Sequence, residues 1–277
     1  AQLDGPLLSA ADAAGRGIET ALLRATRTGR VGFDDLRKVA LSVLAVVLVY
    51  LLVALLIVPE TSERVGFDSR RHVWRTLAPQ ASVPSALRRL FVTAIPAFVA
   101  TWSMGGLYLS LGSSVVARVF GIGNHGAAGA VLFVFFASGA VTSLAITTWD
   151  ANTKLTYGYP ALAGGAIISL AGVLTSMLPL YIVGSIIAGS GFAATFLGAL
   201  DNLSNQTPSH QRGQVFSAVF ITSYIAFSVP AVIAGLVVSH IGLQETVVCY
   251  VAYVLAITVF GALVTAWTRT RNNRVRA

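Results

Sequence analysis

Long apolar runs constrain this chain more than any other feature. Seven stretches, of about 17–25 mainly apolar residues each, are long enough to cross the hydrocarbon core of a bilayer as helices. They are Leu41–Val58, Leu90–Leu111, Ala127–Thr147, Tyr159–Thr175, Leu178–Leu200, Val215–Ser239 and Thr246–Trp267. The sequence therefore predicts an all-α, polytopic transmembrane bundle of about seven helices.

The composition agrees with a chain whose surface is covered by lipid. Hydrophobic residues make up 55% of the sequence and charged residues 11%, whereas soluble domains carry about 25% charged residues. A net charge of +8 would suggest nucleic acid in a soluble protein. Here the basic residues lie between the apolar runs and in the N-terminal stretch. We therefore expect a lipid bilayer as partner, and no nucleic acid.

The fourth and fifth apolar runs are separated only by Ser176 and Met177. A single helix through both would be far longer than the roughly 20 residues that a bilayer needs. Pro179 suits the first turn of a new helix, because the first residues of a helix have no intrahelical partner for their N–H groups. The sequence therefore predicts a break between the two runs.

Basic residues between the runs predict the orientation, because Lys and Arg are enriched in cytoplasmic loops. With seven spans, the loops on one side of the membrane hold only Arg118. The segment 1–40 would lie on that same side and breaks the pattern, since it holds Arg16, Arg24, Arg27, Arg30, Arg37 and Lys38. The other side receives Arg64, Arg70, Arg71, Arg75, Arg88, Arg89, Lys154, Arg212, Arg269, Arg271, Arg274 and Arg276. That side, which includes the C-terminus, is predicted to face the cytoplasm, in a multi-pass protein of the plasma membrane.

The segments outside the runs complete the predicted organisation. Residues 1–40 would lie outside the bundle, as an amphipathic surface helix or as sequence foreign to the native protein. Residues 59–89 are a basic cytoplasmic linker between a single helix (41–58) and a six-helix bundle (90–267). Residues 268–277 are a basic cytoplasmic tail.

Three segments carry a resemblance to a known family. They are Ile57–Thr61, which ends in Pro-Glu-Thr, Trp102–Leu111 (WSMGGLYLSL) and Pro208–Leu243. In this order they resemble the end of the sixth helix, the seventh helix, and the eleventh helix with the loop before it, in the major facilitator superfamily of transporters. The resemblance covers about Leu41–Trp267. The loop Ile146–Gly158 departs from the family pattern, since it offers Asp150 and Lys154 where an Asp-Arg pair is expected.

This resemblance implies half of a major-facilitator-type fold: the last helix of an N-terminal bundle, then a complete C-terminal bundle. A partner N-terminal six-helix bundle would be missing from this sequence. In the family, helices seven, eight, ten and eleven line a central cavity. On the corresponding runs, the aromatic and hydroxyl candidates for substrate contact are Trp102, Tyr108, Ser138, Phe192 and Tyr224. The alternative for each is packing between helices or contact with lipid.

Four residues are candidates for gating. Asp201 follows the fifth predicted run, and Arg212 and Gly213 precede the sixth. Arg212 could pair with Asp201 or with a helix C-terminus and so hold the cytoplasmic side closed. Alternatively, Arg212 only sets the topology and Asp201 is solvated. Pro230 lies in the middle of its run, where it removes a backbone hydrogen bond and bends the helix.

The seven runs contain no Lys, Arg, Asp, Glu or His, so we expect no proton relay, which would need ionisable groups in the membrane. They also offer no base for a nucleophile, and the spacing of His72, His125, His210 and Glu245 fits no metal motif. We therefore expect no enzyme, metal or cofactor. The predicted function is transport of a small molecule by a secondary carrier with alternating access, of the efflux type. The alternatives are a truncated, non-functional half-transporter or a seven-helix receptor.

Overall fold

The computed structural model describes residues 41–42, 44–50, 52–53 and 83–276, and the chain divides into two compact units, 1–72 and 73–277. In the first unit the described residues, all between 41 and 53, are helical. They lie inside the first predicted span. The rest of that span, the segment 1–40 and most of the predicted linker lie outside the described residues.

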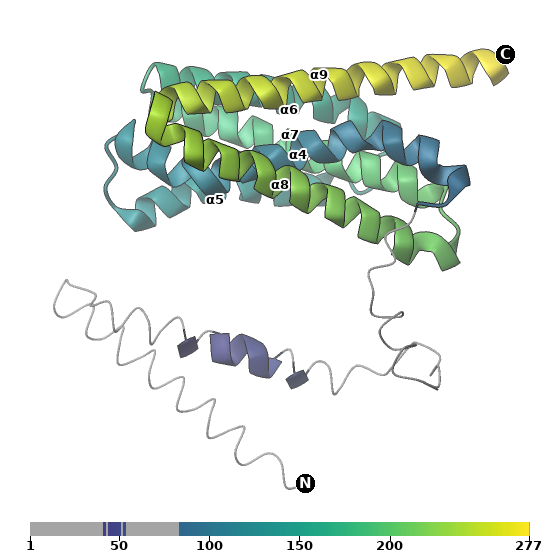
Figure 1. Ribbon diagram of the computed structural model, residues 1–277, viewed down its shortest axis with the longest axis horizontal. Helices are drawn as coiled ribbons and strands as arrows, with labels where there is room; N and C mark the ends of the chain where they lie inside the picture. The colour runs from purple at the N-terminus through teal and green to yellow at the C-terminus, as the bar shows by residue number, and fades with distance from the viewer. Residues whose placement is uncertain (1–40, 43, 51, 54–82, 277) are drawn as a thin grey trace, which may run out of the picture. The chain divides into compact units, whose positions relative to one another are not determined.

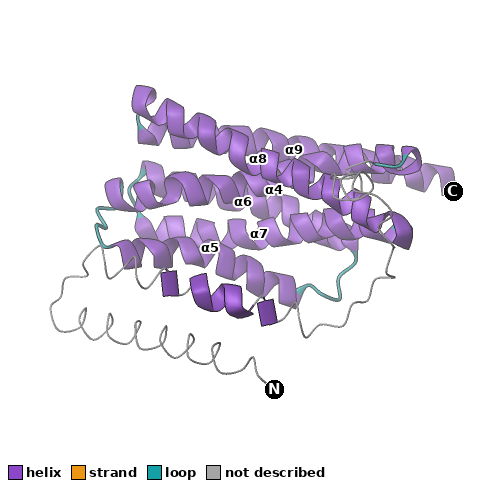
Figure 2. Ribbon diagram, turned by 60° about the horizontal axis from the view of Figure 1, so that its bottom comes forward, coloured by secondary structure: helices purple, strands orange, loops and turns teal. Residues whose placement is uncertain are grey.

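In the second unit, six helices are long and apolar enough to cross a membrane. They are α4 (Ser85–Arg118), α5 (His125–Ala145), α6 (Ala151–Leu174), α7 (Leu178–Asn205), α8 (Arg212–Ile241) and α9 (Leu243–Arg276), with a short 3-10 helix η1 (Ser209–Gln211) before α8. All the regular structure described here is helical (Figure 2). The chain is therefore an all-α, polytopic membrane bundle.

Several helix ends differ from the predicted boundaries. α6 begins at Ala151 and not at Tyr159, and α4 and α7 end at Arg118 and Asn205, beyond Leu111 and Leu200. α4 begins at Ser85, directly after Pro84, so it takes in the end of the predicted linker, and it buries Leu87 against the bundle. α9 continues through the predicted basic tail as far as Arg276 and extends past its neighbours (Figure 1). Charge alone does not end a helix, and the tail contains no Gly or Pro that would.

The predicted break between the fourth and fifth runs is confirmed. α6 ends at Leu174, and Ser176 takes a left-handed backbone conformation with φ of 53°. The Met177 N–H closes the end of α6 by donating to the Gly172 carbonyl at 2.9 Å. α7 then begins with Pro179 in its first turn.

α4 lies in the middle of this unit and packs against α5, α7, α8 and α9, while α6 packs mainly against α7 and also against α9 (Figures 1 and 2). Burial follows this order. In the most apolar 18 residues of each helix, 61% are buried in α4 and 56% in α7, but only 17% in α8. Within this unit, α8 therefore leaves most of its apolar surface uncovered.

Glycines at seven-residue intervals hold α6 against α7. α6 carries Gly158, Gly165 and Gly172, and α7 carries Gly184, Gly191 and Gly198. A β-carbon on any of them would meet the facing helix, at Thr195, Ala188, Tyr181, Ser169, Leu162 and Leu155 respectively. Residues with higher numbers on α6 face residues with lower numbers on α7, as expected for an antiparallel pair. Small residues of this kind let membrane helices approach closely.

Candidate functional site

An aromatic cluster centred on Trp102 gathers three of the predicted cavity residues. The Trp102 ring lies 5.7 Å from Tyr224 and 6.5 Å from Phe192, measured between ring centroids. Phe196 and Phe227 lie 6.0 Å and 6.2 Å from the same ring. All four contacts are edge-to-face, which is a favoured arrangement for aromatic pairs. We call these five residues the Trp102 cluster.

The helical repeat explains why these rings meet. Phe192 and Phe196 are four residues apart on α7, and Tyr224 and Phe227 are three apart on α8, so each pair shares one face of its helix. Trp102 on α4 contacts both faces. The cluster therefore joins three helices that are distant in sequence.

The indole N–H of Trp102 is buried, and it has no hydrogen-bond partner within the described part of the chain. The hydroxyls of Thr195 and Ser223 are also buried without a hydrogen-bond partner in the described part of the chain. A buried polar group without a partner costs free energy, and a buried Trp N–H usually finds an acceptor. Tyr224, at the edge of the cluster, is 59% exposed. The cluster therefore combines a large apolar surface with a hydrogen-bond donor that is not used.

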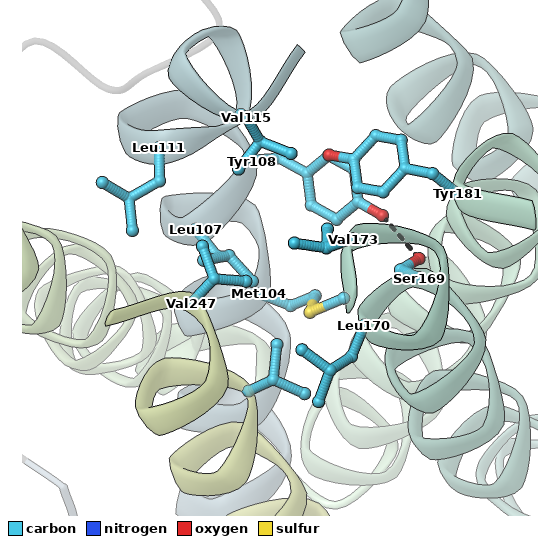
Figure 3. Close-up of a pocket in the computed structure, with 12 residues that line it drawn as sticks. Met104, Leu107, Tyr108, Leu111, Val115, Ser169, Leu170, Val173, Tyr181 and Val247 are labelled. Atoms are coloured by element: carbon cyan, nitrogen blue, oxygen red, sulfur yellow. Dashed lines mark hydrogen bonds between the residues drawn. The ribbon is translucent and has the colours of Figure 1, made fainter. Parts of the chain in front are cut away.

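Tyr108 is not part of the Trp102 cluster. It is 2% exposed, and its hydroxyl shares hydrogen bonds with Ser169 at 3.0 Å and Ser185 at 2.8 Å. These bonds join α4 to α6 and α7 beside a cavity of about 20 Å³, roughly room for one water (Figure 3). The structure therefore places Tyr108 in a packed polar junction between helices.

Ser138 also packs between helices. Its hydroxyl donates to the Phe135 carbonyl at 2.8 Å within α5. A β-carbon on Gly189 of α7 would overlap both that hydroxyl and the Phe135 carbonyl. Ser138 therefore lies at the close contact of α5 with α7.

The two charged gating candidates do not pair with each other, and Arg212 follows the second alternative, a bond near a helix C-terminus. Asp201 accepts a hydrogen bond from the Lys154 ammonium at 2.5 Å, and that lysine side chain is only 7% exposed. The Arg212 Nε instead donates to the Thr207 carbonyl at 3.4 Å, just past the end of α7. The proposed Arg212–Asp201 pair is therefore replaced by Lys154–Asp201, because Lys154 lies in the first turn of α6, packed against α7.

The other two gating candidates are on α8. Gly213 is exposed, and a β-carbon there would have nothing within 4 Å, so no close contact requires glycine. Pro230 has no N–H to donate to the carbonyl of Ala226 one turn earlier. That carbonyl accepts a hydrogen bond from the Ser103 hydroxyl of α4 at 2.9 Å. The carbonyl that Pro230 leaves without an intrahelical donor thus takes part in a hydrogen bond between α4 and α8. Sequence analysis missed this bond.

Polar contacts around the first turn of α6 fix one end of the unit. Asp150 caps α6 by accepting from the Asn152 and Thr153 N–H groups, and hydrogen bonds from the Thr153 hydroxyl and backbone hold the pKa of that carboxyl below its ordinary value. Arg269 of α9 donates to the Asn152 carbonyl at 2.7 Å and to the Thr156 hydroxyl at 2.6 Å. We call this region, with Lys154–Asp201, the charged end.

Sequence analysis missed Phe196, Phe227 and Lys154. The two phenylalanines were detectable, since each lies one helical turn from a candidate that was chosen. Lys154 was interpreted as a loop residue that sets topology, because it precedes the apolar run that begins at Tyr159. The capping signal at Asp150, which starts α6 eight residues earlier than that run, could have corrected this.

In the described residues, no group of three His, Cys, Asp or Glu side chains is placed to hold a metal ion. The geometry thus defines a membrane-spanning helix bundle with an aromatic cluster between three helices. No protein-family model matches the chain, and no curated protein matches it.

Proposed function

We propose that this chain forms the C-terminal half of a secondary carrier of the major facilitator kind. It moves a neutral, amphipathic or aromatic molecule out of the cell by alternating access. Six apolar helices support the membrane part of this proposal. The order of the spans and the motifs at Pro59, Trp102 and Pro208 support the family. Transporters place their substrate near the bilayer midplane, between helices of this type.

The Trp102 cluster is the observation that carries the proposal. Small-molecule sites are mostly apolar and aromatic, with a few polar groups that fix orientation. Here the unpaired Trp102 N–H is such a group, and the rings around it are contributed by α4, α7 and α8. A substrate with a hydrogen-bond acceptor would satisfy the N–H when the helices move apart. The absence of charged side chains from the cluster favours neutral substrates.

Exposed apolar surface on two helices supports a second bundle as partner. On α5, Phe133, Val141 and Leu144 are 67%, 66% and 75% exposed. On α8, Tyr224 and Leu236 are 59% and 66% exposed. A second six-helix bundle would cover part of this surface and complete the cavity. The basic residues at the charged end favour a cytoplasmic location for that end and for the C-terminus.

The test is efflux of Nile red, a neutral aromatic dye with a carbonyl acceptor, from energised cells that produce the protein in its native form. Trp102→Phe keeps an aromatic ring and removes the N–H. We expect the efflux rate to fall about fivefold, because one hydrogen bond in an apolar site contributes about 1 kcal/mol. Trp267→Phe is the control, since that side chain is 61% exposed and far along α9.

Equal efflux by Trp102→Phe and by the unmodified protein would remove the cluster from the substrate pathway. No efflux by the unmodified protein, with correct membrane insertion, would favour the alternative of a non-functional half. A drop that appears equally in Trp267→Phe would indicate a general effect of losing tryptophan.

A further inference from the structure

A groove of about 390 Å³ opens between α8 and α9, on side chains other than those of the Trp102 cluster. Its walls are mostly aliphatic and aromatic: Val229, Pro230, Ile233, Ala234 and Val237 from α8, with Thr246, Cys249, Tyr250 and Tyr253 from α9. Ligand pockets typically measure about 300–1,000 Å³ and have apolar walls with few polar groups. The groove matches that description.

Local sequence explains why a groove forms here. Only Gly242, with φ of 91°, separates α8 from α9, and the two helices contact each other much less than α6 and α7 do. Pro230 lies in the groove wall, where a proline bends a helix. Ala234 and Cys249 are too short to fill the space between the helices. The groove thus lies where the two helices pack loosely and two wall side chains are small.

The two tyrosines of the groove differ in their hydrogen bonds. Tyr250 donates to the Ser103 carbonyl at 3.0 Å. The Tyr253 hydroxyl reaches only the Ser103 hydroxyl, at 3.5 Å, beyond the usual 2.5–3.0 Å of an O–H···O bond. Tyr253 is also 38% exposed, although its neighbours in the groove are apolar. Its O–H is therefore a donor with a poor partner in an apolar setting, which costs free energy.

Depth in the membrane restricts what can satisfy this donor. At 1.5 Å per residue, Tyr253 lies about 10 Å along α9 from Thr246, where the apolar run begins, roughly a third of the way across a 30 Å hydrocarbon core. Water is absent from that core, and an acyl chain has no acceptor there. An acceptor better placed than the Ser103 hydroxyl can be carried by a molecule that dissolves in the membrane.

We propose that the α8–α9 groove binds one lipophilic molecule with a carbonyl acceptor, such as a ketone, ester or amide, which enters from the bilayer. The carbonyl accepts from Tyr253, and the apolar body lies along Val229 and Ile233. This site goes beyond the proposed function, because binding here requires no transport and can be measured without it.

The test uses benzophenone, a lipophilic ketone that cross-links to nearby C–H groups under ultraviolet light. The full chain in lipid nanodiscs is irradiated, and the modified residues are mapped by tandem mass spectrometry. We expect adducts to concentrate in Val229–Val237 and Thr246–Tyr253. Fluorenone should compete for these adducts at least about fivefold better than fluorene, which has the same rings without the carbonyl.

Three variants sharpen the test. Tyr253→Phe should lower the yield of groove adducts about fivefold, because it removes only the donor. Cys249→Leu should block the groove and lower the yield further. Ala252→Leu is the matched control: it adds similar bulk at an exposed neighbouring position of α9 that does not line the groove. It should leave the yield unchanged.

Two results would overturn the proposal. The first is an even spread of adducts over other exposed positions of α9, such as Val259 and Phe260, which would show simple dissolution in lipid. The second is equal competition by fluorene and fluorenone, with no effect of Tyr253→Phe. The groove would then bind hydrocarbon alone, as a lipid chain supplies. Either result leaves the proposed transport untouched, since efflux depends on Trp102 and is measured separately.

Discussion

The α6–α7 and α8–α9 pairs are both antiparallel helices joined by a very short turn, yet they pack in opposite ways. In α6–α7, glycines such as Gly165 and Gly191 bring the two backbones together along the whole pair. In α8–α9, a β-carbon on Gly235 would meet nothing within 4 Å, and a groove separates part of the pair.

The physical reason for the difference is the size of the facing side chains. Without β-carbons, the α6 and α7 backbones approach closely enough for extensive van der Waals contact, which is a main source of helix association in lipid. Between α8 and α9, Ala234 and Cys249 are too short to fill the space, and Val229 and Ile233 in the groove wall are 50% and 54% exposed. One pair is therefore a fixed support, and the other leaves room for a ligand or for movement.

The largest expected effect is on the closely packed α6–α7 pair. Gly165→Ala would place a β-carbon on the backbone of Ala188, so the helices must separate. Overpacking of this kind costs about 3 kcal/mol or more when backbone has to move. We expect a clear drop in thermal stability in detergent. Gly164→Ala, next to it with nothing within 4 Å, is the control and should be neutral or slightly stabilising. Equal losses for both variants would contradict the packing argument.

An intermediate effect concerns the charged end of the fixed pair. Asp201→Asn leaves the Lys154 ammonium, 7% exposed, without a charged partner, whereas Lys154→Met leaves Asp201 37% exposed to solvent. Because the lysine is the more buried partner, we expect Asp201→Asn to cost about 2 kcal/mol, and more than Lys154→Met. Thermal unfolding of both variants and of the double variant checks the order. If Lys154→Met were the more destabilising variant, the larger desolvation cost would lie with Asp201 and not with Lys154.

The smallest expected effect concerns how α8 is held. Ser103→Ala leaves the Ala226 carbonyl without its bond and should cost about 1 kcal/mol. In a Pro230→Ala background, residue 230 regains an N–H for that carbonyl, so Ser103→Ala should then cost less. A double-mutant cycle on thermal unfolding measures this coupling. Additive effects would show that Ser103 does not compensate for the proline.

Much of the fold could be read from the sequence because spans depend on local properties. Six apolar runs became six helices, and Pro179 began a new helix after the break at Ser176. Both results follow from the length of an apolar run and from backbone restrictions that act within a few residues. The helix ends were less accurate: α4, α6, α7 and α9 all continue into polar residues beyond the apolar run, and α6 begins eight residues before it.

The candidate site depended on which helix faces meet, and local properties do not determine that. Trp102, Phe192 and Tyr224 came together as aromatic residues on neighbouring helices, but Tyr108, equally aromatic, was placed in a packed junction with Ser169. The sequence by itself determined a membrane bundle and its turns, since the bilayer imposes length and apolarity on each helix separately. Only the tertiary structure decided that Asp201 pairs with Lys154 and not with Arg212, because the close approach of α6 to α7 sets which side chains are within reach.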